Sequence, residues 1–159
     1  MLLSDLQPIL QDIANYLAEL HQTLLDEYEA FSHGDSIAMQ QAGNTEYRLS
    51  EILDDLKLEQ FNLLENAGLN RDQAGMTTYI KFQAESAQQM LESLWQRIAK
   101  LEQNCQRLDK INSLIIKDHR YHVETITQLP PGQLPVTASQ SARITTVYDP
   151  SSSSFQAIA

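Results

Sequence analysis

The fold is decided by the longest uninterrupted stretch of the chain, residues 87–129, which read AQQMLESLWQRIAKLEQNCQRLDKINSLIIKDHRYHVETITQL. This stretch has neither Gly nor Pro, and its apolar positions recur in alternating steps of four and three residues. Such spacing lines one side of an α-helix and is typical of a coiled-coil seam. The seam consists of Ala87, Leu91, Leu94, Ile98, Leu101, Cys105, Leu108, Asn112, Ile115, His119, His122, Ile126 and Leu129. At 1.5 Å per residue, the pattern predicts a helix of roughly 60 to 70 Å.

A shorter helix is predicted at the start of the chain. Ser4 and Gln7 have the spacing of a capping box, and Pro8 still lies within the first turn, where it is tolerated. His33-Gly34 ends the helix, because Gly favours the left-handed conformation that follows a helix C-terminus. The predicted buried stripe is Leu6, Leu10, Ile13, Leu17, Leu20, Leu24 and Tyr28.

A second helix follows directly, capped by Asp35 or Ser36 and ending near Gly68. Its predicted seam is Ala38, Ala42, Thr45, Leu49, Ile52, Leu56 and Leu63. The connection to the long helix contains Gly68 and Gly75 and has room for one short helix.

The body shows no strand pattern, so we expect an all-α fold. An antiparallel helical hairpin plus one long helix makes a coiled-coil-like three-helix bundle, in which the third helix extends beyond its partners. Residues 130–159 are rich in Pro, Ser, Thr and Gln, and only Arg143 and Asp149 are charged. The sequence therefore predicts a bundle domain over residues 1–129 and a disordered tail over residues 130–159.

The charge of the chain limits its partners. Its net charge is −10, with 13 acidic and two basic residues between positions 1 and 66. Such a chain repels nucleic acid and anionic bilayers. The sequence has no run long enough to span a membrane and no signal peptide, so we expect a soluble, cytoplasmic protein without direct membrane insertion. The single cysteine, Cys105, excludes an internal disulfide and Cys-rich zinc sites.

The seam offers little catalytic chemistry. His119 and His122 form an H-x-x-H pair, but di-metal sites in bundles need Glu-x-x-His on two helices, and no Glu here precedes a His by three residues. Cys105 and His119 lie 14 residues apart, about 21 Å along one helix, which is too far for a nucleophile and its base. We therefore expect no enzymatic activity, no metal and no cofactor.

Two other features are candidates for binding. Asn112 is a polar residue within the apolar seam, where it either specifies helix register or binds an incoming partner helix. Tyr148-Asp149-Pro150 combines an aromatic side chain with a turn in an otherwise featureless tail, which is the composition of a short docking motif.

Together, three features resemble the FlgN family of flagellar type III export chaperones. These are the acidic helical body, the segment Cys-Gln-Arg-Leu-Asp-Lys-Ile-Asn-Ser-Leu-Ile-Ile at residues 105–116, and the tail motif Thr-Val-Tyr-Asp-Pro ending at Pro150. Asp109 and Ser113 replace the Asn and Gly that the family often carries. The resemblance implies a chaperone that keeps hook-associated proteins unassembled and brings them to the export gate.

The resemblance also implies where partners bind. In that family the C-terminal part binds the helical terminal segment of the client, and the tail Tyr docks on the cytoplasmic domain of the export-gate membrane protein. Combined with an overhanging seam, this predicts the client-binding residues Asn112, Ile115, Ile116, His119, Val123 and Ile126. The predicted gate-docking residues are Tyr148, Asp149 and Pro150. The alternative is a structural coiled-coil protein that self-associates through the overhang and has no client; weak self-association is also compatible with a chaperone.

Overall fold

The computed structural model describes residues 3–128 and contains four helices and no strand within that range. The helices are α1 (Leu3–His33), α2 (Ser36–Asn66), α3 (Gln73–Lys81) and α4 (Glu85–Thr127). The predicted all-α fold is confirmed. With 43 residues, α4 is about 65 Å long, against about 46 Å for α1 and α2 with 31 residues each.

The ends of α1 and α2 lie where glycine allows a left-handed backbone. Gly34 has a φ of +65° and Gly68 a φ of +72°. After Gly34, the side chain of Asp35 accepts a hydrogen bond of 3.0 Å from the backbone N–H of Ala38, which is the cap expected for α2. A two-residue turn therefore reverses the chain, and α1 and α2 form the predicted hairpin.

The short helix α3 is held against the loop that precedes it. Asp72 caps α3 by accepting a 2.8 Å hydrogen bond from the N–H of Gly75. A Cβ at position 75 would lie only 1.9 Å from the carbonyl oxygen of Asn70, so the contact requires glycine. The short helix expected in this connection is thus confirmed.

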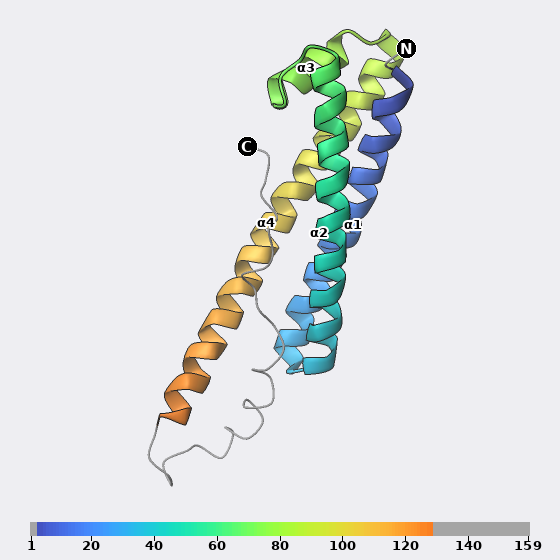
Figure 1. Ribbon diagram of the computed structural model, residues 1–159. Coiled ribbons are helices and arrows are strands. Elements are labelled where there is room, and N and C mark those ends of the chain that lie inside the picture. Colours follow the sequence, from blue (N-terminus) through green and yellow to red (C-terminus); the bar gives the residue numbers. More distant parts are fainter. Residues whose placement is uncertain (1–2, 129–159) are drawn as a thin grey trace.

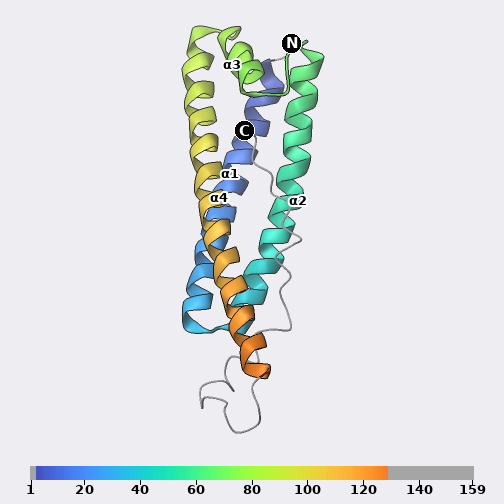
Figure 2. The ribbon, with the colours of Figure 1, turned by 90° about the vertical axis from the view of Figure 1, so that its left-hand side faces the viewer.

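Helix α1 packs against both of its long neighbours. It contacts α2 along the hairpin and α4 along much of its length, while α3 crosses the end of the bundle near the N-terminus (Figure 1). Figure 2 shows that α2 and α4 lie on either side of α1 at the α3 end. We call this end the upper half and the end with the α1–α2 turn the lower half. In Figure 1, α4 leans away from α2 toward the lower end and extends past the turn.

A leucine-rich core occupies the upper half. Its fully buried members include Leu6, Leu10 and Leu17 from α1, with Leu53 from α2 and Ile98 from α4. The α1 stripe is buried as predicted except at its last position, because Tyr28 is 43% exposed. The hydrophobic core therefore ends before α1 does.

The predicted seam of α2 is displaced from the observed one. Leu53 and Leu64 are fully buried, whereas Ile52, Leu56 and Leu63 are only half-buried. The buried face of α2 also includes the polar residues Glu46, Ser50, Lys57 and Gln60. Ala42 and Leu49 are buried as predicted, but the other five predicted positions each lie one residue before a buried one, because a search for apolar periodicity passes over the polar residues on this face.

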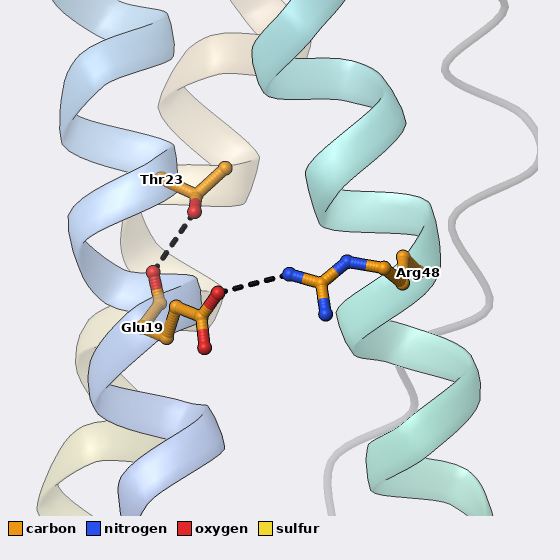
Figure 3. Close-up of polar contacts among 3 residues, drawn as sticks. All are labelled: Glu19, Thr23 and Arg48. Carbon is orange, nitrogen blue, oxygen red and sulfur yellow. Dashed lines mark hydrogen bonds and ion pairs between the residues drawn. The ribbon is translucent and has the colours of Figure 1, made fainter.

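An exposed ion pair joins α1 and α2 halfway along the hairpin. Glu19 Oε1 lies 2.9 Å from Arg48 Nη2, and the Thr23 hydroxyl donates to the backbone oxygen of Glu19 (Figure 3). The side chains of Glu19 and Arg48 are 48% and 56% exposed, so water and salt screen their attraction. We expect the pair to contribute less than about 1 kcal/mol to stability.

Candidate functional site

Two hydrogen bonds fix the register of α4 on α1. The Cys105 thiol donates to the backbone oxygen of Leu17 at 3.6 Å, and Asn112 Nδ2 donates to that of Leu24 at 3.0 Å. Both bonds join residues 88 positions apart, and they lie seven residues apart on each helix. The two helices are therefore parallel and pair with a heptad repeat.

Asn112 lies inside this interface. It is 1% exposed, and its Nδ2 also donates a 2.7 Å hydrogen bond to Oε2 of Glu27, which is 2% exposed. The Oδ1 atom of Asn112 has no hydrogen-bond partner within residues 3–128. A buried amide that pairs with a buried carboxylate favours the interpretation of Asn112 as a register-specifying residue. Sequence reasoning missed Glu27, whose partner lies 85 residues away.

The other predicted client-binding residues divide into three groups. Ile116 is buried, at 8% exposed, whereas Ile115 and His119 are half-buried. Val123 and Ile126 belong to α4, but their side chains are not among those that the structure describes. These positions share the lower part of α4, and their role in client binding stays a prediction.

The overhang is shorter than expected. With an offset of 88 residues, the last residue of α1, His33, lies level with residue 121 of α4. Only the end of α4 after that point projects beyond its partner (Figure 1). Asn112 and Ile116 were expected on the overhang, but both pack beside α1 or the hairpin turn. The expectation that this segment has few intramolecular contacts was therefore wrong for these two residues.

A buried ion pair links α2 to α4 above this site. Lys57 Nζ lies 2.8 Å from Oε1 of Glu102, and the two side chains are only 8% and 11% exposed. Moving a charge out of water is costly, and here the attraction between the two side chains offsets that cost. Loss of either side chain would leave the other charge buried without a partner, which would destabilise the fold. This ion pair fixes the position of α2 relative to α4, just as the hydrogen bonds of Asn112 fix the position of α1 relative to α4.

Cys105 is a core residue without nucleophilic character. The side chain is 1% exposed, and burial, aided by the nearby carboxylate of Glu102, raises the pKa of its thiol to about 12. A neutral thiol is a poor nucleophile at physiological pH. The predicted separation from His119 holds, since both lie on α4 and are 14 residues apart.

Metal and membrane sites were sought among the residues that the structure describes. Between residues 3 and 128, no three His, Cys, Asp or Glu side chains lie close enough together to hold a metal ion. None of the helices in that range is both long and apolar enough to cross a membrane. Tyr148, Asp149 and Pro150 lie outside the described residues, so their predicted role stays a prediction.

Comparison with known proteins identifies the family. Residues 1–129 match the family described as FlgN protein, which is most of the chain. No curated protein and no solved structure matches. The matched span covers every described helix, including the α1–α4 interface around Asn112. The chain therefore belongs to the FlgN family, the cytoplasmic and non-enzymatic chaperones that serve flagellar hook-associated proteins during export.

Proposed function

We propose that this chaperone binds the helical terminal segment of a hook-associated protein along the lower part of α4. The proposed contact residues are Asn112, Ile115, Ile116, His119, Val123 and Ile126. We further propose that Tyr148, with Asp149 and Pro150, docks the loaded chaperone on the cytoplasmic domain of the export-gate protein. Family membership supports the client class.

The observation that carries the location is the weak packing of the lower half. Below the level of Leu24 and Asn112, the buried apolar side chains among those that the structure describes are Ala30, Met39, Ala42 and Ile116, with no leucine among them. Two alanines, one methionine and one isoleucine bury less apolar surface than the leucine-rich core, so this part of the bundle gains less from packing than the upper half does. An incoming amphipathic helix would supply the apolar surface that the lower half lacks.

The lower part of α4 also keeps apolar surface available. Ile115 is half-buried, and the exposed fractions of Ile111 and Leu114 are 38% and 58%. Beyond residue 121, α4 continues without α1 beside it. These features suit helix-against-helix capture, in which apolar residues three and four positions apart act as anchors.

The experiment replaces Ile115 and Ile126 together by Asp in the full chain. Two charges on the proposed contact face should abolish binding to full-length hook-associated proteins of the same bacterium, measured by calorimetry. Circular dichroism should show that most of the helix remains. A matched control, Ile37→Asp with Leu58→Asp, places the same charges on α2, where the two side chains are 70% and 53% exposed.

Two results would count against this location. If the folded Ile115→Asp/Ile126→Asp variant still binds the client fully, the proposed location is excluded. It is also excluded if the control variant loses as much client affinity as the double variant does. If the double variant unfolds, Ile126→Asp alone repeats the test beyond the end of α1.

The docking proposal is tested separately with Tyr148→Ala. An aromatic anchor is worth about 2 kcal/mol or more, so affinity for the isolated gate domain should fall about thirtyfold. Client affinity should not change, because the proposed client site lies on α4. Phe155→Ala is the control, since it removes the other aromatic side chain near the end of the tail. Unchanged gate affinity would remove Tyr148 from the docking site.

A further inference from the structure

The side of α4 opposite the face that packs on α1 carries a mixed basic and apolar surface, which we call the outer stripe. It consists of Arg107, Lys110, Ile111, Leu114 and Lys117, and the exposed carboxylate of Asp118 borders it next to Leu114. Residues three, four and seven positions apart are neighbours on a helix surface, so these five side chains form one continuous patch. All five are exposed, and Leu114, at 58%, is the most exposed of the large apolar side chains that the structure describes on α4.

The charges of the outer stripe are available to a partner. Within residues 3–128, Arg107, Lys110 and Lys117 make no ion pair, whereas Arg48 and Arg71 pair with Glu19 and Glu65. Three cations beside two exposed apolar side chains form a surface that attracts carboxylates and buries apolar groups in the same contact.

The outer stripe differs from its surroundings. The first 66 residues, which include α1 and α2, carry 13 acidic and two basic residues. Charges in water are screened beyond about 8 Å at physiological ionic strength, so a partner that touches α4 responds mainly to the local cations.

We infer that the client helix accepted by this chaperone is acidic: an amphipathic helix that lays its apolar stripe on Ile111 and Leu114, with flanking Asp or Glu residues beside Arg107, Lys110 and Lys117. This inference rests on the proposal that lower α4 is the client-binding helix, and it adds a second contact face, opposite Asn112 and Ile116, together with the charge of the client segment that this face selects. Specificity then arises in part from rejection, since a basic helix would meet three cations of like charge.

The test uses three synthetic helices that share one apolar stripe and carry Glu, Gln or Lys at the flanking positions. Titrated into the full chain at low salt, the Glu helix should bind about tenfold more tightly than the Gln helix, and the Lys helix most weakly. The variant Lys110→Glu/Lys117→Glu should reverse this order. Lys81→Glu/Arg97→Glu changes the net charge by the same amount away from the outer stripe and should preserve the order.

Four results would overturn the inference. One is an affinity that does not depend on the flanking charge, and another is an unchanged order in Lys110→Glu/Lys117→Glu. The third is full binding of the Glu helix by Ile111→Ser/Leu114→Ser, which would place the contact elsewhere. A dimer seen by light scattering and dissociated by Lys110→Glu/Lys117→Glu would also overturn it, by assigning the stripe to a second copy.

Parallel titrations with full-length hook-associated proteins separate this inference from the proposed function. Equal binding by wild type and Lys110→Glu/Lys117→Glu would overturn the charge selection and leave the proposed client site intact. Loss of binding in Ile115→Asp/Ile126→Asp, together with weaker binding in Lys110→Glu/Lys117→Glu, would support both. Binding that none of these variants weakens would defeat the proposed client site itself.

Discussion

The upper and lower halves of the bundle use the same three long helices but different buried side chains. The upper half buries leucines from α1, α2 and α4, and α3 adds Met76 and Ile80. Both halves bury polar side chains, Lys57, Gln60 and Glu102 in the upper half and Glu27, Glu46 and Asn112 in the lower half, but the lower half has no leucine core around them. Because apolar burial supplies most of the stability of a fold, the upper half should hold the bundle together. The lower half is then the part that is free to adapt to a client.

The largest expected effect comes from breaking the buried ion pair. Lys57→Met leaves the carboxylate of Glu102 without its ammonium partner in a site that is nearly closed to water. We expect a loss of about 3 to 5 kcal/mol in the free energy of unfolding, measured with denaturant. Arg48→Met breaks an exposed pair instead and should cost less than about 1 kcal/mol. If both variants lose the same free energy of unfolding, burial does not make the Lys57–Glu102 pair more important for stability than the Glu19–Arg48 pair.

A smaller effect should distinguish the two halves directly. Leu53 is fully buried in the upper core, so Leu53→Ala should cost about 2 to 5 kcal/mol. Ile116 lies in the lower half, outside the main core, and Ile116→Ala should cost about 2 kcal/mol, the lower end of the range for such truncations. Thermal or denaturant unfolding of both variants makes the comparison. A larger loss for Ile116→Ala would reverse our ranking of the halves.

Cysteine labelling measures how often each half opens. At pH 8 the buried Cys105 thiol is neutral, because burial raises its pKa to about 12, and it should react only after the helices separate. A cysteine can be placed in the lower half by Ile116→Cys in a Cys105→Ala background. This cysteine should react at least about tenfold faster than Cys105 does in the wild type. Labelling in denaturant controls for intrinsic reactivity. Equal native rates would mean that the bundle opens as one unit.

The same thiol predicts a pH dependence. The pKa of folded Cys105 lies above the ordinary value of 9.0, so folding favours the protonated thiol. This contribution is fully present below about pH 9 and is lost as the pH rises from about 9 to 12. Cys105→Ala should therefore lose less stability than wild type between pH 9 and pH 10.5. Parallel unfolding curves at both pH values would test this difference.

The smallest expected effect is that of the tail. Deletion of residues 130–159 should leave the melting temperature nearly unchanged, because a segment rich in Pro and Ser buries little apolar surface. Differential scanning calorimetry of the two chains provides the measurement. A loss of several kcal/mol would show that the tail packs on the bundle and that stability is not confined to the helices.

Local sequence signals were enough to predict the helices and their ends. Gly34 and Gly68 end α1 and α2 because few other residues accept their positive φ, and the unbroken seam predicted α4 as one long helix. Such signals depend on neighbours in the chain. They carry no information about which distant side chain meets which.

The polar interior could not be predicted in this way. Asn112 meets Glu27 across 85 residues of chain, and Lys57 meets Glu102 across two helices. Charged residues are normally exposed, so a sequence analysis assigns them to the surface unless tertiary structure provides a partner. The charge pattern of the outer stripe, by contrast, was readable from the sequence, but only the structure shows that its five side chains are exposed.

The parallel pairing of α1 and α4 has a consequence for the order of folding during synthesis. Helix α2 follows α1 after a two-residue turn, but the partners of α1 in α4 emerge from the ribosome 88 residues later. At 5 to 20 residues per second, the apolar face of α1 that α4 covers stays open for roughly 4 to 18 seconds. We expect nascent chains that end before Leu91 to form the hairpin and to aggregate through this open face. Until α4 has been synthesised, we therefore expect the chaperone itself to be prone to aggregation.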